Sequence, residues 1–219
     1  MICLLFDLDG TITDPELGIT SAVQYAAKKL GFDAPDRTVF RDFIGPPLRK
    51  SFAERFSLTE EQAETAVKYY REYYRPKGIF ECVLYPGIEK ALEEFDRLGY
   101  SLGIATVKPE IFAEKIMDHF GLTKRFRFIS GSELDNSRDD KADVILRAME
   151  NINGSTKENT VMIGDRSYDM IAAKKVGIKC IGANYGYGSE EELREAGADA
   201  TADSPCEIRS ALEKLDLKK

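Results

Sequence analysis

Residues 1–14, MICLLFDLDGTITD, contain the stretch that decides the fold of this 219-residue chain. The segment 2–6 is a short, continuous apolar run that ends abruptly at Asp7. An apolar run without alternation predicts a parallel strand buried on both faces, because helices cover both sides of such a sheet. A polar loop, Asp7-Leu8-Asp9-Gly10-Thr11, follows at once. We therefore expect the first strand to deliver polar side chains to one edge of a parallel sheet.

The remainder of the chain falls into two parts with different patterns. Residues 15–84 have helical periodicity, and the paired prolines in Ile44-Gly45-Pro46-Pro47-Leu48 predict a turn from which a new helix starts near Pro47. From residue 85 onward strands and helices alternate. The expected strands are 100–105, 126–129, 160–163 and 178–182, and the expected helices are 88–98, 110–120, 142–152, 168–176, 190–196 and 205–215.

This alternation predicts an α/β fold, a doubly wound parallel sheet of Rossmann-like type with right-handed crossovers. The core domain then comprises residues 1–14 and 85–219, and residues 15–84 form a helical domain inserted after the first strand. We find no internal repeat and no segment of low complexity.

Composition narrows the class of protein. The 31 basic and 38 acidic residues give a net charge of −7, which argues against a nucleic-acid or acidic-membrane binder. Four cysteines without paired spacing exclude zinc-ribbon and CxxC redox motifs, and the lone His119 excludes chemistry that requires two histidines. No apolar run approaches the roughly 20 residues of a membrane span, and the N-terminus lacks the features of a signal peptide. We therefore expect a cytoplasmic protein with reduced thiols.

Ligands of open parallel sheets bind beyond the carboxyl ends of the strands, so the residues directly after each apolar run carry the most information. These positions are Asp7-Leu8-Asp9-Gly10-Thr11, Thr106-Val107-Lys108 and Gly164-Asp165-Arg166-Ser167-Tyr168-Asp169, with Lys141 at the start of a helix. Three carboxylates, a hydroxyl and an ammonium would meet there, and like charges so close require a cation. With no paired histidines or cysteines for a softer metal, Mg²⁺ fits best.

The four motifs DLDGT, the strand-terminal threonine, the lysine and GDxxxD resemble those of the haloacid dehalogenase superfamily of phosphohydrolases. Their order and spacing match along nearly the whole chain. The insertion resembles the four-helix cap domain of the phosphoglycolate-phosphatase-like branch, and the segments IGPPL and TxKP are similar to that branch. DPELGI and GDR resemble a bacterial group named either phosphoglycolate phosphatase or 5′-nucleotidase.

The resemblance implies a role for each site residue. Asp7 would be the nucleophile that forms an aspartyl-phosphate, and Asp9 the general acid and base. Mg²⁺ would be held by the carboxylates of Asp7 and Asp165 and by the backbone carbonyl of Asp9. Thr106, Lys141 and backbone N–H groups near Gly10 would bind the phosphoryl group, while Asp169 would orient Lys141 or support the metal shell.

Several residues have weaker or structural interpretations. Lys108 and Arg49 are candidate contacts for a substrate anion, and Gly45 is a candidate for a close approach of the insert to substrate. An isolated carboxylate at Asp14, Asp135 or Asp139 is typical of a turn or helix cap.

The sequence leaves more than one function open. The leading hypothesis is a Mg²⁺-dependent phosphomonoester hydrolase, phosphoglycolate phosphatase-like, that acts on a small phosphorylated metabolite. A 5′-nucleotidase, a sugar-phosphate mutase and, least favoured, a non-catalytic binding module are the alternatives. The dehalogenase branch is disfavoured, because it has no need of an acid at Asp9 and binds no metal. We expect a monomer or homodimer with no nucleic-acid or membrane partner.

Overall fold

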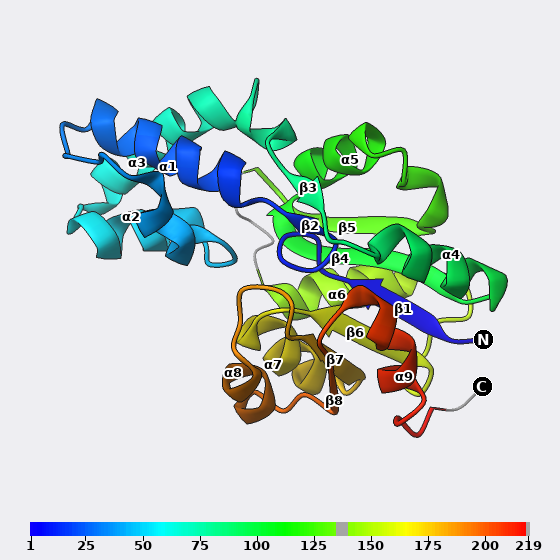
Figure 1. The fold of residues 1–219 in the computed structure, drawn as a ribbon. Helices are drawn as coiled ribbons and strands as arrows, with labels where there is room; N and C mark the ends of the chain where they lie inside the picture. Colours follow the sequence, from blue (N-terminus) through cyan, green and yellow to red (C-terminus); the bar gives the residue numbers. More distant parts are fainter. Residues whose placement is uncertain (135–139, 218–219) are drawn as a thin grey trace. The chain divides into compact units, whose positions relative to one another are not determined.

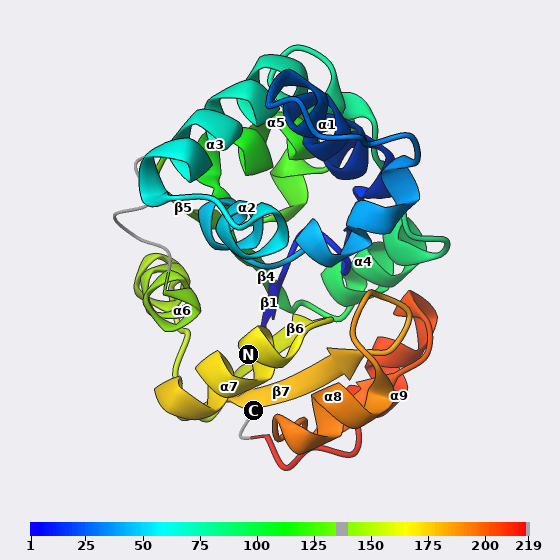
Figure 2. The ribbon, with the colours of Figure 1, turned by 90° about the vertical axis from the view of Figure 1, so that its left-hand side faces the viewer.

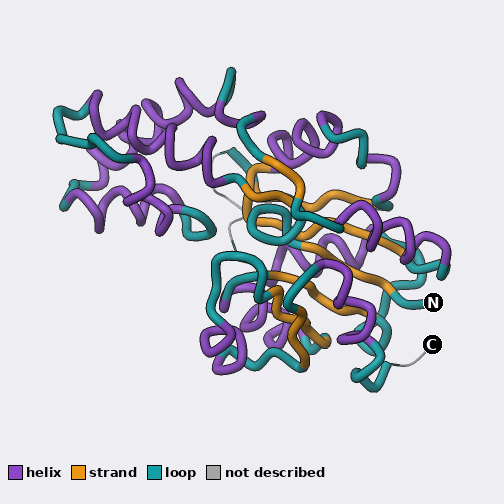
Figure 3. The backbone as a smooth tube through the Cα atoms, in the orientation of Figure 1, coloured by secondary structure: helices purple, strands orange, loops and turns teal. Residues whose placement is uncertain are grey.

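The computed structural model describes residues 1–134 and 140–217, so Asp135 and Asp139 lie outside the described residues. The core contains a six-stranded sheet of order β5-β4-β1-β6-β7-β8, and all neighbouring pairs in it are parallel (Figures 1 and 3). Its strands are β1 (Cys3–Phe6), β4 (Ser101–Pro109), β5 (Phe128–Ser132), β6 (Thr160–Gly164), β7 (Lys179–Ala183) and β8 (Ala200–Ala202). The predicted α/β class with a Rossmann-like parallel sheet is confirmed.

Strand β1 is central because the sequence makes it apolar on both faces. It pairs with β4 on one side and β6 on the other, and Leu4, Leu5 and Phe6 are fully buried. Successive side chains of a strand point to opposite faces. Leu5 therefore joins the core beneath α6 and α7, whereas Phe6 packs against Phe95 of α4 with ring centroids 6.2 Å apart.

The helices that follow each strand cover both faces of this sheet. They are α4 (Ile88–Arg97), α5 (Glu110–His119), α6 (Lys141–Asn151), α7 (Ser167–Val176), α8 (Glu190–Glu195) and α9 (Ile208–Leu212). Five of them begin and end within one residue of the expected positions, and α9 is shorter because a 3₁₀ turn, Pro205–Glu207, precedes it. Among the described helices, none has the length and apolar character needed to cross a bilayer.

Several strands differ from the sequence expectation. The sixth strand, β8, was not expected, because its sequence ATA lacks the branched and aromatic residues that favour strands. Strand β4 runs on to Pro109 with a register irregularity after Ala105, so Thr106 lies within this strand and not after it. A separate two-stranded pair, β2 (Thr13–Asp14) and β3 (Val83–Leu84), stands at the two connections to the insert.

Residues Pro15–Val83 form a compact unit of their own, and Met1–Asp14 with Leu84–Lys219 form the other. The insert contains α1 (Glu16–Lys29), α2 (Leu48–Phe56) and α3 (Glu60–Tyr74), with 3₁₀ segments at Arg37–Phe43 and Gly78–Phe80 (Figure 2). The expectation was a four-helix cap; the described residues of the insert contain three α-helices, with the 3₁₀ segment Arg37–Phe43 between α1 and α2. Pro47 is the N-cap of α2, as the paired prolines predict.

The insert has its own aromatic core. Phe43 lies between Phe40 and Phe52, with ring centroids 6.0 and 5.0 Å away, and Tyr70 of α3 packs edge-on against Phe52. Helix α3 starts at a capping box in which Thr59 and Gln62 satisfy each other's backbone N–H groups. These contacts give the insert a hydrophobic core separate from that of the sheet.

Candidate active site

The predicted site residues meet at the carboxyl edge of the sheet, as parallel strand order requires. Asp7 follows β1, Asp165 follows β6, and Lys141 is the first residue of α6. The Lys141 Nζ atom lies 3.0 Å from Asp7 Oδ1 and 2.6 Å from Asp169 Oδ1. Carboxylate oxygens of Asp7, Asp165 and Asp169 all lie within 4.8 Å of one another. The site therefore holds three buried carboxylates around one ammonium.

The loop after β1 is shaped to bring Asp7 into this cluster. Asp7 Oδ1 accepts the N–H of Leu8 at 2.8 Å, and the buried Leu8 side chain anchors the loop in the core. The loop closes through Gly10 N–H, which donates to the Thr13 carbonyl at 2.8 Å. Gly10 has a φ of +85°, and a Cβ atom there would lie 2.0 Å from Asp165 Oδ2. Glycine is therefore required at this position for two independent reasons.

A second loop, which sequence reasoning missed, encloses Asp165 from the other side. Residues 184–188, NYGYG, follow β7 and are called the strap below. The Tyr187 N–H donates to Asp165 Oδ2 at 2.9 Å, and the Gly188 N–H donates to the Asp165 carbonyl at 3.0 Å. A Cβ at Gly186 would lie 2.3 Å from Asp165 Cβ. The alternating glycines directly after a strand were the available sequence signal.

Burial and mutual repulsion raise the pKa values of Asp165 and Asp169. The pKa of Asp165 is raised well above its ordinary value by burial and by the neighbouring charges of Asp169 and Asp7. Burial raises the pKa of Asp169 to about 6, although the Lys141 ammonium opposes this effect. Burial disfavours the charged form of Lys141, but the attraction of Asp169 and Asp7 outweighs it and raises the pKa of that ammonium. One cation is thus too little positive charge for three ionised carboxylates.

This donor set fits a hard divalent cation. Oxygen ligands from carboxylates are what Mg²⁺ prefers, and an added dication would relieve the repulsion that raises the Asp165 pKa. Within the cluster, Asp169 Oδ1 faces Lys141 and its Oδ2 accepts the Arg166 N–H at 3.1 Å. The cluster is therefore one that could hold a metal, with Asp169 placed to orient Lys141.

The Asp9 side chain lies apart from the carboxylate cluster. Its Oδ2 is 2.5 Å from Nζ of Lys108, and both side chains are largely buried. The other oxygen, Oδ1, is buried and lacks a hydrogen-bond partner among the described residues. Burial raises the pKa of Asp9, although the nearby Lys108 ammonium opposes this effect. Lys108, a candidate substrate contact from sequence, is thus placed against the carboxyl of Asp9.

The remaining predicted residues fall in two places. Thr106 is buried in β4, and its hydroxyl accepts the Lys108 N–H at 3.3 Å. Arg49 and Gly45 belong to the insert. There Arg49 forms an ion pair with Glu64 at an exposed position, and Gly45 has a φ of +103°.

Comparison with known proteins decides the family. The model of the haloacid dehalogenase-like hydrolase family matches residues 4–183, which include the first strand, the insert and the GDxxxD motif. The chain belongs to the haloacid dehalogenase-like hydrolase family. The resemblance inferred from the four motifs is confirmed, and the protein is an enzyme of this hydrolase family.

Relatives of the hydrolase carry several names. A 5′-nucleotidase of Pseudomonas aeruginosa is 44% identical over 87% of this chain and 86% of its own length. The tyrosine-protein kinase PtkA of Mycobacterium tuberculosis is 33% identical over 95% of this chain and 72% of its own. A phosphoglycolate phosphatase of Vibrio parahaemolyticus is 28% identical over 94% and 93%. A crystal structure of a predicted phosphatase from Clostridium acetobutylicum, 42% identical, superposes with a TM-score of 0.92 over 98% of this chain and 100% of that one.

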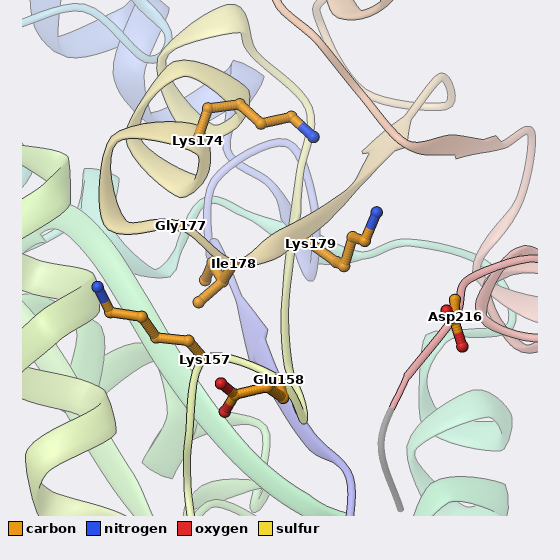
Figure 4. Close-up of a pocket in the computed structure, with 7 residues that line it drawn as sticks. All are labelled: Lys157, Glu158, Lys174, Gly177, Ile178, Lys179 and Asp216. Atoms are coloured by element: carbon orange, nitrogen blue, oxygen red, sulfur yellow. The ribbon is translucent and has the colours of Figure 1, made fainter.

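A pocket of about 520 Å³ in this hydrolase lies elsewhere in the core (Figure 4). It is lined by Lys157, Glu158, Lys174, Gly177, Ile178, Lys179 and Asp216. Residues 178 and 179 stand at the amino end of β7, opposite the edge that carries Asp165. Lys174 and Lys179 both pair with Asp199, at 2.6 and 3.0 Å, which neutralises part of the positive charge. The pocket contains none of the predicted site residues and is not the candidate active site.

Proposed function

We propose that this protein is a Mg²⁺-dependent phosphomonoester hydrolase in which Asp7 is the nucleophile. The observation that carries the proposal is the way Asp7 is held. Its Oδ1 accepts the Leu8 N–H at 2.8 Å and lies 3.0 Å from the Lys141 ammonium, so these two contacts fix the carboxylate through that oxygen. A carboxylate fixed by one oxygen presents the other to an electrophile in a defined orientation.

The reaction proceeds in two displacements at phosphorus. In the first, Asp7 Oδ2 forms a bond to phosphorus while the bond from phosphorus to the leaving oxygen breaks, and Asp9 gives its proton to that oxygen. In the second, water attacks phosphorus, Asp9 takes the proton of that water, and the bond to Asp7 breaks. Burial supports this role, because it raises the pKa of Asp9 and keeps a proton available for the leaving group.

Three further groups would hold the phosphoryl oxygens. Lys141 places its ammonium beside Asp7, Thr106 is buried in the adjacent strand β4, and backbone N–H groups near Gly10 belong to the loop after β1. Such donors act where charge develops in the transition state and need no reorganisation. Asp169 keeps Lys141 in place through its 2.6 Å ion pair.

Mg²⁺ would be held by the carboxylates of Asp7 and Asp165 and by the backbone carbonyl of Asp9. When bound, it would neutralise charge between the nucleophile and the phosphate. The donor chemistry and the raised pKa of Asp165 support this assignment.

The substrate class that we propose is a 5′-nucleotide, because the relative of that name is 44% identical over most of both chains. Phosphoglycolate is the second candidate, supported by phosphoglycolate phosphatases at 28% identity. Both are small phosphorylated metabolites. The four free cysteines support a reducing compartment such as the cytosol.

The test is Mg²⁺-dependent phosphate release over a panel of 5′-nucleotides, phosphoglycolate, sugar phosphates and pyrophosphate, with Asp7→Asn as the blank. One substrate that leads the others by a hundredfold in kcat/KM, about 2.7 kcal/mol of transition-state discrimination, identifies the substrate. Release that persists undiminished in Asp7→Asn, or in EDTA, contradicts the nucleophile or the metal respectively. Phosphate that reaches a sugar or a tyrosine faster than water points to a mutase or a kinase instead.

A further inference from the structure

The strap, residues 184–188, contacts the candidate metal ligand Asp165 through both its side chain and its main chain. Tyr187 N–H reaches the carboxylate at 2.9 Å and Gly188 N–H reaches the carbonyl at 3.0 Å. A Cβ at Gly188 would lie 2.1 Å from that carbonyl oxygen, so the strap touches Asp165 as closely as backbone can. The orientation of the Asp165 carboxylate therefore depends on where the strap lies.

The side chains of the strap fasten it to a different part of the core. The Tyr187 hydroxyl donates a hydrogen bond to Asp14 Oδ1, and the Tyr185 hydroxyl donates to the Thr11 carbonyl at 3.1 Å. The Tyr185 ring also packs edge-on against Tyr85, with centroids 5.1 Å apart. Thr11 is the last residue of the first motif, DLDGT, and Asp14 follows that motif. Both phenols thus connect the strap to the segment that carries Asp7.

We infer that Tyr187 is a positioning residue for Asp165. It carries two contacts on one residue: a hydroxyl bonded to Asp14 and an N–H bonded to the Asp165 carboxylate. The first contact fixes the strap, and the second transfers that position to the Asp165 carboxylate. The other oxygen of this carboxylate accepts a longer hydrogen bond, 3.4 Å, from the Thr11 hydroxyl. The inference rests on the proposed function in one respect, namely that Asp165 binds the cation.

A residue that only stabilises the fold would leave the Mg²⁺ affinity of the folded protein unchanged, whereas a positioning residue for Asp165 would alter that affinity. Groups that orient a metal ligand typically change metal affinity by about 10- to 100-fold when removed. Tyr187→Phe keeps the ring and the N–H and removes only the hydroxyl. We therefore expect about a 10-fold weaker Mg²⁺ affinity with a native far-ultraviolet spectrum.

The Asp14 side of the hydrogen bond gives independent variants. Asp14→Ala removes the acceptor and should weaken Mg²⁺ binding as Tyr187→Phe does. Asp14→Asn keeps a carbonyl oxygen that accepts from the phenol, so it should restore most of the affinity. The double variant Tyr187→Phe with Asp14→Ala should bind Mg²⁺ no more weakly than either single variant, because the two substitutions remove the same hydrogen bond. Tyr100→Phe, a tyrosine at the amino end of β4, is the matched control.

The experiment is a calorimetric titration of Mg²⁺ alone into the metal-free full chain of each variant. Weakened binding in Tyr187→Phe and Asp14→Ala, with recovery in Asp14→Asn, supports the proposal. Wild-type protein that binds Mg²⁺ together with variants that bind it equally well overturns the positioning role and leaves the proposed function intact. Wild-type protein that does not bind Mg²⁺ overturns both. Equal losses in Asp14→Asn and Asp14→Ala would also overturn it, because charge and not the hydrogen bond would then be responsible.

Discussion

Replacement of Lys141 by methionine tests the electrostatic account of the site through stability. The Lys141 side chain is 6% exposed, and its ammonium lies 3.0 Å from Asp7 and 2.6 Å from Asp169. Methionine keeps most of the side-chain volume and removes the charge. Loss of one partner from a buried ion pair leaves an uncompensated charge and typically costs about 3–5 kcal/mol. We expect a destabilisation of that size in the metal-free protein.

The pH dependence of this loss has a definite sign. In the wild-type chain the pKa of Asp169 is raised to about 6, above its ordinary value, so the folded state binds more protons than the unfolded state between those values. The protonated Asp169 carboxyl contributes its full stabilisation below the pKa that it has in the unfolded chain. This contribution is lost as pH rises through the pKa of Asp169 in the folded protein. Without the Lys141 ammonium, which lowers the pKa of Asp169, that pKa rises further in the folded state. The destabilisation of Lys141→Met should therefore be smaller at about pH 5 than at about pH 8.

Urea unfolding followed by circular dichroism, in EDTA and in Mg²⁺, measures both effects. A free cation concentration of 100 times Kd adds about 2.7 kcal/mol to a folded state that alone binds it, so Mg²⁺ should recover part of the loss. The control is Lys175→Met, because Lys175 pairs with Asp140 at 2.6 Å but is exposed, and its removal should leave the midpoint nearly unchanged. Equal stability of Lys141→Met and wild type at about pH 8 in EDTA would refute the reasoning.

Three further outcomes follow from the described contacts. Gly10→Ala places a Cβ 2.0 Å from Asp165 at a positive φ, so it should lower stability by about 1–3 kcal/mol and weaken Mg²⁺ binding in the calorimetric titration. The control is Gly99→Ala, which has a φ of +74° and no atom within 4 Å of the added Cβ and should keep the Mg²⁺ affinity. Asp199→Asn should destabilise the fold near neutral pH but match wild type in strong acid. Burial alone would raise the pKa of Asp199, but hydrogen bonds and the nearby lysines outweigh burial, so the pKa in the folded state is lowered. The stabilisation from this carboxylate is lost as pH falls through that lowered pKa. Acid unfolding curves of the two proteins should converge. In the first turnover, before water enters the reaction, Asp9→Asn should slow release of a poor alcohol leaving group by about 10²- to 10⁴-fold and of p-nitrophenol much less, since only the alcohol needs a proton. Equal slowing of both in that first turnover would contradict a general-acid role.

Local sequence patterns predicted the sheet and the place of the site well. The apolar run before Asp7 indicated a strand buried on both faces, and β1 is central with both neighbours parallel. Because parallel strands share one carboxyl edge, the polar residues after β1 and β6 were expected to meet, and the structure brings Asp7 and Asp165 into one cluster. Strand type and chain direction are enough for this inference.

Contacts between distant segments were not predictable in the same way. Asp14 has the sequence character of a turn residue, yet it accepts a hydrogen bond from Tyr187, 173 positions away. No local period encodes such a pair. Strand β8 was not predicted for a different reason. Its alanine-rich triplet has no intrinsic strand preference and becomes a strand by pairing with β7. Sequence patterns thus predict which elements form, while tertiary contacts decide which side chains are held in place.

The glycines explain how a cluster of like charges can be built at all. Asp165 is enclosed by Gly10, Gly186 and Gly188, and a Cβ at Gly164 would lie 2.2 Å from the Asp169 carboxyl carbon. Backbone at these positions can approach the carboxylates where any side chain would collide. The N–H groups that the carboxylates accept come from neighbouring residues, Leu8, Tyr187 and Arg166. Backbone dipoles hold the carboxylates in position without neutralising them, so the excess negative charge of the cluster remains for a cation to satisfy. The repulsion between the carboxylates therefore lowers the stability of the metal-free protein, and the same repulsion creates affinity for the metal. A substitution that relieves it, such as Asp165→Asn, should stabilise the fold in EDTA while it weakens Mg²⁺ binding.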